Sequence, residues 1–114
     1  MSRDPKLRFA DIIEGCSAID VYILGYSFDD FQRDPKTRDA VVRQMEIIGE
    51  AVKSIPDALR KKQSQIPWRN IAGFRDMLIH SYFGIDDSVV WDAAVAHLPK
   101  LRQACELLLS ELEP

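Results

Sequence analysis

The 114-residue sequence predicts an all-α fold, a bundle of four to five helices that run alternately up and down. Three observations lead to this fold class. Apolar residues recur at steps of three and four over most of the chain, which is the period of an amphipathic helix. The strict alternation of apolar and polar residues that marks a strand is missing from the sequence. Short polar connections separate the helical segments, and helices joined in this way pack as antiparallel neighbours.

The composition is that of one globular domain, and we expect it to span residues 1–114. Hydrophobic residues make up 46% and charged residues 29% of the chain. No apolar run approaches the roughly 20 residues that a membrane span needs. The N-terminal residues Met1 to Lys6 lack the apolar core of a signal peptide, so we expect a cytoplasmic protein with no membrane contact.

Two long helices are expected in the first half of the chain. The first should run over residues 6–26, and a one-turn helix should begin at Ser27-Phe28-Asp29-Asp30, where a serine is followed three residues later by an acid. Asp34-Pro35 gives a stronger start signal for the second long helix, which should reach about Ile55. Gly49 in its middle costs about 1 kcal/mol of helix propensity relative to alanine. We therefore expect close backbone packing at Gly49.

A third helix should follow a polar, basic connector at residues 57–63. Pro67 can open this helix, because a missing N–H is tolerated in the first helical turn. The helix should end somewhere between Ile79 and Phe83, with Gly84 as its C-terminal cap. Its apolar side includes aromatic residues that we interpret as core or interface residues.

The last helix should start at Asp86-Asp87-Ser88, which supplies an N-cap. Pro99 lies inside this helix, where it removes a backbone donor and clashes with the carbonyl group four residues earlier. We therefore expect a kink or a break near His97 to Pro99. His97 is interpreted as a structural residue that caps or pairs where helix hydrogen bonds are lost.

A metal ion or an organic cofactor is not expected. Cys16 and Cys105 are far apart and each lies in an apolar helical stripe, which favours two buried free thiols over a disulfide or a metal site. The chain has two histidines and lacks the Cys/His and HExxH-type spacings of zinc sites. Its five glycines are scattered singly, so the sequence has no Gly-rich phosphate loop.

The net charge of −3 argues against a protein that holds nucleic acid by bulk electrostatics, because such proteins normally carry a basic excess. A local basic site is compatible with this charge. The best local candidates are Arg60-Lys61-Lys62, Arg69 and Arg75, which lie in one third of the chain.

Residues 75–82, Arg-Asp-Met-Leu-Ile-His-Ser-Tyr, place an arginine, a histidine and a tyrosine in an otherwise apolar helical pattern. Buried charges are usually paired or kept for a site. Arg75 therefore has two interpretations. It forms an ion pair with a carboxylate of a neighbouring helix, with Asp20, Glu46 and Glu50 as candidates, or it binds a phosphate with its fork of donors.

Asp76 and His80 are four residues apart, so the carboxylate can face the imidazole and fix its tautomer. This arrangement suits a general acid or base, and it is also a common surface contact between two helical residues. Tyr82 is by default a packed aromatic residue with its hydroxyl group at the rim.

In combination, Arg75, Asp76, His80 and Tyr82 resemble the motif of the HepT-like toxins of the HEPN superfamily. In that motif a polar residue follows the arginine, the histidine lies five residues after the arginine, and the tyrosine lies two residues later. The similarity covers nearly the whole chain. Further matching segments are Ser27-Phe28-Asp29-Asp30-Phe31, Glu46-Ile47-Ile48-Gly49-Glu50-Ala51, Ile66-Pro67-Trp68 and Phe83-Gly84-Ile85-Asp86.

The resemblance implies a homodimeric helical bundle of HEPN type that acts as a metal-independent endoribonuclease on RNA. It also implies a partner, a minimal nucleotidyltransferase antitoxin of MntA type. Carried over to this sequence, it makes Arg75 and His80 the catalytic pair, Asp76 a supporting residue and Tyr82 the position where the partner attaches AMP. We expect AMP at Tyr82 to silence the enzyme by its bulk and by a phosphate that competes for the same cationic groups.

Helix geometry favours a two-chain site. Arg75 and His80 are turned about 140° from one another on an ideal helix, so they converge within one chain only if the helix ends near His80 or the arginine reaches far. In a dimer, two copies of the motif that face each other across a two-fold axis would remove this requirement. The second long helix and the motif helix are the candidate dimer surfaces. The competing interpretation is a non-catalytic helical module that docks on a nucleotidyltransferase or presents its substrate.

Overall fold

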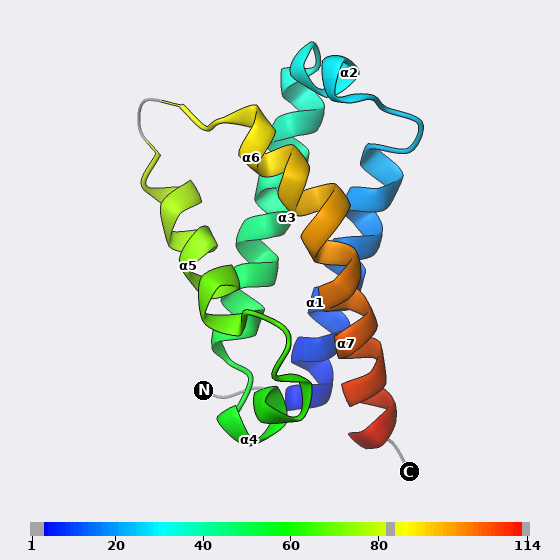
Figure 1. The fold of residues 1–114 in the computed structure, drawn as a ribbon, viewed down its shortest axis with the longest axis vertical. Coiled ribbons are helices and arrows are strands. Elements are labelled where there is room, and N and C mark those ends of the chain that lie inside the picture. Colours follow the sequence, from blue (N-terminus) through cyan, green and yellow to red (C-terminus); the bar gives the residue numbers. More distant parts are fainter. Residues whose placement is uncertain (1–3, 82–83, 113–114) are drawn as a thin grey trace.

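The structure, a computed structural model, describes residues 4–81 and 84–112. Within these ranges all regular structure is helical, which confirms the predicted all-α class. The helices α1, α3, α5 and the continuous run from α6 to α7 point alternately up and down (Figure 1). The bounds are α1 Pro5–Tyr22, α2 Phe28–Gln32, α3 Pro35–Lys53, α4 Asp57–Arg60, the 3-10 turn η1 Lys61–Gln63, α5 Trp68–Ile79, α6 Asp87–Asp92, the π-helical turn η2 Ala93–His97 and α7 Leu98–Leu112.

The core lies where α1 packs on α3 and on α7. Its largest side chains are completely enclosed, and each contributes about 1.5–3 kcal/mol of hydrophobic stabilisation. Cys16 and Cys105 are buried there as free thiols, as predicted. Burial raises the pKa of Cys16 to about 12 and raises that of Cys105 as well. Fully buried residues of this core are Phe9, Ile12, Ile19, Val41, Ile48, Val52, Leu101 and Leu108.

Three of the predicted helix starts are confirmed. Ser27 and Asp30 form a reciprocal capping box at the start of α2. Asp34 accepts from the Thr37 N–H group and caps α3, whose first residue is Pro35. Asp86 caps α6 by accepting from the Ser88 N–H group.

The predicted end of the first helix is wrong by four residues, because α1 stops at Tyr22 and not at Tyr26. Gly25 has a φ of +78°, a conformation that glycine adopts without steric cost and that cannot continue a right-handed helix. Tyr26 instead donates its hydroxyl hydrogen to Asp34 at 2.7 Å and ties the loop to the start of α3. The helix α3 likewise stops at Lys53, two residues before the predicted end.

The interruption predicted near Pro99 is present as the π-helical turn η2. Pro99 is the second residue of α7 and has no N–H group to donate to a carbonyl of the preceding turn. A single π-helical turn, in which each hydrogen bond spans five residues, is one form that an interruption of an α-helix takes.

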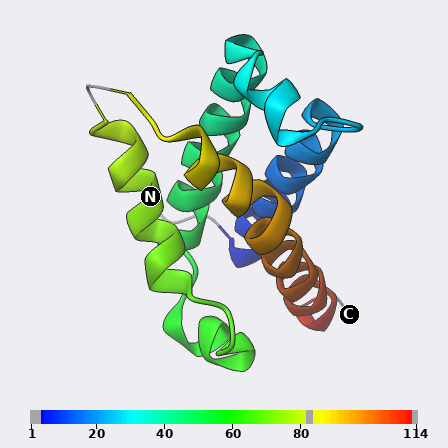
Figure 2. The ribbon, with the colours of Figure 1, turned by 45° about the horizontal axis from the view of Figure 1, so that its top comes forward.

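The helix α5 lies on the other side of α3 from α1, as both views show (Figure 1; Figure 2). It starts at Trp68 with Pro67 as N-cap, one residue later than predicted, and it ends at Ile79 with His80 as C-cap. The predicted cap at Gly84 is therefore wrong, although Gly84 has a positive φ. Among the helices of the described ranges, none has the length and apolarity to cross a membrane.

Close packing at Gly49 is confirmed, and it sets the distance between α3 and α5. A methyl group built on Gly49 would lie 3.5 Å from Arg75 Cα and would overlap Arg75 Cβ. The absence of a side chain at Gly49 therefore lets the first residue of the sequence motif sit directly against α3.

Candidate active site

Arg75 lies at the contact between α5 and α3, with 27% of its side chain exposed. Its Nε is 3.1 Å from Glu50 Oε2, so the two side chains form an ion pair. The N–H group of Nε does not point at this oxygen closely enough to form a hydrogen bond. Its Nη1 donates to Asp76 Oδ1 at 3.2 Å. Glu50 was one of the three carboxylates that the sequence offered for this pair, and the ion-pair interpretation of Arg75 is confirmed.

Asp76 is shared between two cations. Lys53, the last residue of α3, donates to Asp76 Oδ1 at 2.9 Å, and Arg75 contacts the same oxygen. The hydrogen bond from Lys53, assisted by Arg75, lowers the pKa of Asp76, so this carboxylate stays ionised below its usual range. Sequence reasoning missed Lys53. The sequence did contain a signal for it. Lys53 lies four residues after Gly49, so the two residues share the side of α3 that meets α5.

His80 is oriented by the main chain of Asp76. Its Nδ1 lies 2.8 Å from the Asp76 carbonyl oxygen, while the contacts that hold the Asp76 carboxylate come from Lys53 and Arg75. The predicted pairing of carboxylate and imidazole thus takes another form. A carbonyl oxygen can only accept, so Nδ1 carries a proton and donates it, and in the neutral ring Nε2 is the basic nitrogen.

Arg75, Asp76 and His80 lie in the second half of α5 and at its C-cap, and the contacts described among them all involve Asp76. Asp76 contacts both of the others, one through its side chain and one through its main chain. The helix ends at Ile79, and His80 is its C-cap, whose N–H group donates to the Asp76 carbonyl oxygen at 3.2 Å. Tyr82, the predicted modification site, lies outside the described residues.

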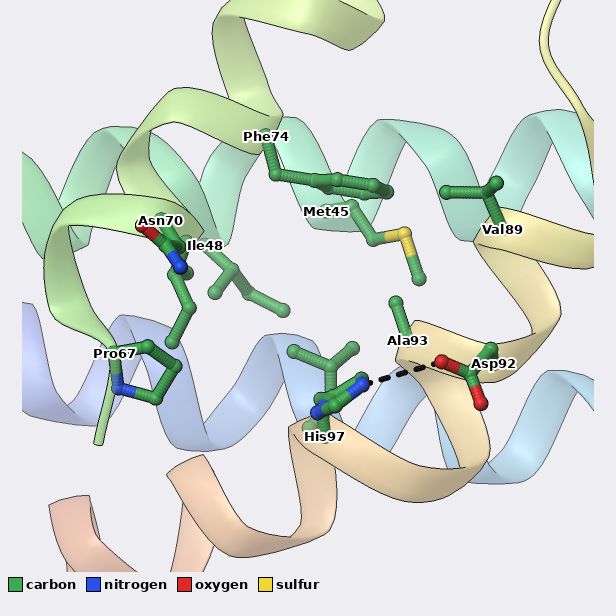
Figure 3. A pocket seen from close by; sticks show the side chains of 11 residues that line it. Met45, Ile48, Pro67, Asn70, Phe74, Val89, Asp92, Ala93 and His97 are labelled. Carbon is green, nitrogen blue, oxygen red and sulfur yellow. Dashed lines mark hydrogen bonds and ion pairs between the residues drawn. The ribbon is translucent and has the colours of Figure 1, made fainter. Parts of the chain in front are cut away.

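His97 lies at a different place, beside a mainly apolar cavity of about 290 Å³ between α3, α5 and the α6 to α7 run. Figure 3 shows its ring directed to Asp92, with Nε2 3.2 Å from Asp92 Oδ2. The two residues are five apart, which matches the five-residue period of the π turn. Pairing at the helix interruption is confirmed, and the His97 side chain is 60% exposed.

Two aromatic residues of α5 were predicted to be core or interface residues. Trp68 is buried, with 7% of its surface exposed, and Phe74 packs partly buried against the core and lines the cavity (Figure 3). Both positions agree with the core interpretation. The chemistry of this region therefore depends on its charged groups.

The sequence matches a known family along most of its length. A sequence model of the family described as "Ribonuclease HepT-like" matches residues 12–108. "Probable ribonuclease HepT" of Thermococcus cleftensis is 42% identical over 108 residues, which cover 95% of this chain and 98% of that protein. "Putative RNase TTE0752" of Caldanaerobacter subterraneus subsp. tengcongensis is 41% identical over 110 residues, or 96% of this chain and 98% of that protein. No solved structure matches the chain.

Proposed function

The chain belongs to the HepT-like ribonuclease family, and from that membership we propose that it is a metal-independent endoribonuclease and the toxin of a toxin-antitoxin module. One observation carries the proposal. Asp76 contacts Arg75 through its carboxylate and His80 through its carbonyl oxygen. A single residue thereby holds a cation and a proton carrier, the two groups that RNA cleavage without a metal ion needs.

RNA can be cut in this way because it carries its own nucleophile, the 2′-hydroxyl group beside the scissile phosphate. In the proposed reaction the 2′-oxygen attacks phosphorus while Nε2 of one His80 takes its proton. The bond from phosphorus to the 5′-oxygen breaks, and this oxygen takes a proton from the imidazolium of a second His80. The products are a 2′,3′-cyclic phosphate and a free 5′-hydroxyl group, so proton transfer accounts for both steps.

Arg75 stabilises the charge that builds on the phosphate oxygens. Its contacts to Glu50 and Asp76 use Nε and Nη1, and we assign Nη2 to the phosphate. Asp76 has a positioning role, because it holds the guanidinium and the imidazole without contacting the substrate. Its lowered pKa keeps the carboxylate charged for this purpose.

The two-histidine reaction requires a homodimer, and α3 and α5 are the surfaces that we propose for it. Met77 and Ile79 on α5 and Ile47 on α3 leave 37–43% of their surface exposed. Met77→Glu should convert the protein to a monomer and abolish cleavage, because a charge would be buried between the copies. Leu24→Glu is the matched control, since Leu24 is 81% exposed in the loop that follows α1, and α1 lies on the other side of α3 from α5. Full activity of a monomeric Met77→Glu variant would contradict the shared site.

The antitoxin proposal concerns Tyr82, two residues after His80. A minimal nucleotidyltransferase partner would transfer AMP to the Tyr82 hydroxyl group, and the added phosphate would compete with RNA for Arg75 and His80. RNA cleavage should be measured before and after modification, with the extent followed by mass spectrometry. Unchanged cleavage by fully modified protein would contradict this proposal. The Tyr82→Phe variant should cleave RNA and should not be inhibited by the partner.

The catalytic proposal is tested with purified protein and total RNA in the presence of EDTA. His80→Ala should lower the cleavage rate by about 10²–10⁴-fold, because it removes the proton carrier. His97→Ala is the matched control, and it should cleave like the wild type. Mapping of the cut ends should show 2′,3′-cyclic phosphates. Cleavage by His80→Ala at the wild-type rate would remove this histidine from the mechanism.

One observation favours a second function, that of a non-catalytic module that docks on a nucleotidyltransferase. Arg75 and Asp76 are each held by two oppositely charged partners, as purely structural residues would be. Expression of the chain alone separates the two functions. Growth arrest that is lost in Arg75→Ala supports the enzyme, and harmless expression together with tight binding of the partner supports the module.

A further inference from the structure

A second group of cations lies at the opposite end of α5. A surface pocket of about 310 Å³ is lined by residues of α4, η1 and the first turn of α5. Its lining includes the cations Arg60, Lys61 and Arg69 together with one carboxylate, Asp57. The pocket is thus locally basic in a chain whose net charge is −3. Such a site attracts an anion through local rather than net charge.

The walls of this pocket are fixed before any ligand arrives. The indole Nε1 of Trp68 donates to the carbonyl oxygens of Arg60 at 3.1 Å and Gln63 at 3.0 Å. These two bonds tie the connector to the first turn of α5. A preorganised pair of walls loses little conformational entropy when a ligand binds.

Several donors in the pocket are available for an acceptor. Asp57 pairs with Arg60, whereas Lys61 and Arg69 are exposed and form no ion pair within the described part of the chain. Because Pro67 provides no side-chain cap, the N–H groups of Arg69 and Asn70 also lack an acceptor among the residues described. Cationic side chains beside free helix amides are a combination suited to phosphate.

The position of the pocket on α5 links it to the candidate active site. Arg69, Gly73, Asp76 and His80 follow one another at steps of four, three and four residues, so they share one side of the helix. Arg69 and His80 are separated by about 16 Å along the helix axis. Gly73, which lies between them, is exposed and has open space around it. This side of α5 is therefore open at Gly73, and between Gly73 and His80 it carries Asp76, whose carboxylate is paired with Lys53 and Arg75.

We propose that the pocket formed by Arg60, Lys61 and Arg69 binds a backbone phosphate of the RNA strand whose scissile phosphate lies at His80. The inference rests on the proposed ribonuclease function, which it deepens by giving the substrate a second contact and a direction along α5. The enzyme therefore takes single strands that are long enough to span both sites. A substrate of two nucleotides reaches only the catalytic end.

The test uses the double variant Lys61→Ala/Arg69→Ala and two RNA ligands. Fluorescence anisotropy with a labelled 12-nucleotide RNA that carries 2′-O-methyl groups measures binding without cleavage. The double variant should bind this RNA on the order of tenfold more weakly, because charge-assisted hydrogen bonds to one phosphate are lost. Its affinity should also depend less steeply on salt concentration. With cleavable RNA, KM should rise for the 12-mer and kcat should stay unchanged, and a dinucleotide should be cleaved as by the wild type.

Two control variants separate charge and phosphate binding from folding. Lys62→Ala removes a neighbouring cation that pairs with Glu111 and does not line the pocket, so it should bind RNA like the wild type. Lys61→Arg/Arg69→Lys keeps both charges and should retain most of the affinity. If the conservative pair binds as weakly as the alanine pair, the loss reflects altered structure and the proposal is overturned.

The outcomes distinguish this inference from the proposed chemistry. Weaker RNA binding by the double variant supports the phosphate site even if the wild type proves unable to cleave. Equal binding of the 12-mer by wild type and double variant overturns the site, whatever the cleavage rate. A double variant that binds RNA normally and loses only its complex with the nucleotidyltransferase assigns the pocket to a protein partner. Binding of free AMP in the pocket with no effect on the 12-mer assigns it to a nucleotide.

Discussion

The two sides of α3 differ in how they are packed and in what they carry. Toward α1 and α7 the contact is closed by completely buried side chains such as Phe9, Ile48 and Leu101. Toward α5 it is made around Gly49 and a chain of ion pairs, and α5 itself buries only Trp68 and Leu78 among its described residues. The first side supplies the stability of the fold, and the second holds the charged groups of the site. The comparison teaches that stability and chemistry are carried by different helix contacts.

The largest effect on stability is expected in the core. Phe9→Ala should lower the free energy of unfolding by about 3–5 kcal/mol, because it leaves a cavity between tightly packed helices. Ile79→Ala on α5 should cost the single chain, measured in the monomeric Met77→Glu background, about 1 kcal/mol or less, since Ile79 is 39% exposed there. Urea denaturation of both variants measures the difference. Similar losses for the two variants would show that α5 is as tightly integrated as the core.

An intermediate effect on stability is expected when a methyl group is added to a glycine at a helix contact of α3. Gly49→Ala forces a methyl group against the backbone-fixed Cβ of Arg75, so α5 must move, and we expect a loss of about 1–3 kcal/mol. Cleavage should fall with it, because Arg75 is displaced. Gly15→Ala is the matched control. Its methyl group meets the side chain of Ile48 on the side of α1, with Cγ1 at 2.8 Å and Cδ1 at 3.1 Å, and leaves Arg75 in place. Cleavage by Gly15→Ala should persist, and equal activity of the two variants would contradict the assignment of the site to the α5 side.

The smallest expected effect is on the stability of the fold at acid pH. Hydrogen bonds from the Thr37 hydroxyl, the Tyr26 hydroxyl and the Thr37 N–H group lower the pKa of Asp34 to about 2. A carboxyl group whose pKa is depressed by folding stabilises the native state above its unfolded pKa of about 3.9, and this contribution is lost as the pH falls through the folded value. Wild type and Asp34→Asn should therefore differ in unfolding free energy by a constant amount from pH 7 to about pH 5, and the gap should shrink toward pH 2. A gap that persists at pH 2 would be inconsistent with this origin.

Local signals in the sequence predicted most of the fold. Ser27, Asp34 and Asp86 act through bonds to residues two or three positions away, so their roles as caps can be read from the sequence. Pro99 acts through its missing N–H group, which is also a local property. The end of α1 was predicted wrongly because the periodic apolar pattern continues to Tyr26, whereas Gly25 turns the chain and Tyr26 packs against a later helix.

The candidate site was predicted in its residue types and only partly in its geometry. The ion pair of Arg75 with Glu50 was one of three alternatives, because sequence periodicity does not determine which helix lies opposite. Lys53 was missed for the same reason. The orientation of His80 by a main-chain carbonyl depends on where α5 ends, and side-chain spacing carries no information about that bond.

The most direct test of the separation between stability and chemistry is a paired measurement on Arg75→Ala. We predict that its rate of RNA cleavage in EDTA falls by about 10²–10³-fold, because a donor to the phosphate oxygens is lost. Its free energy of unfolding should change by about 1 kcal/mol or less, since partly exposed ion pairs contribute little to stability. Cleavage at the wild-type rate would contradict the account, and so would a loss of activity accompanied by unfolding as extensive as that of Phe9→Ala.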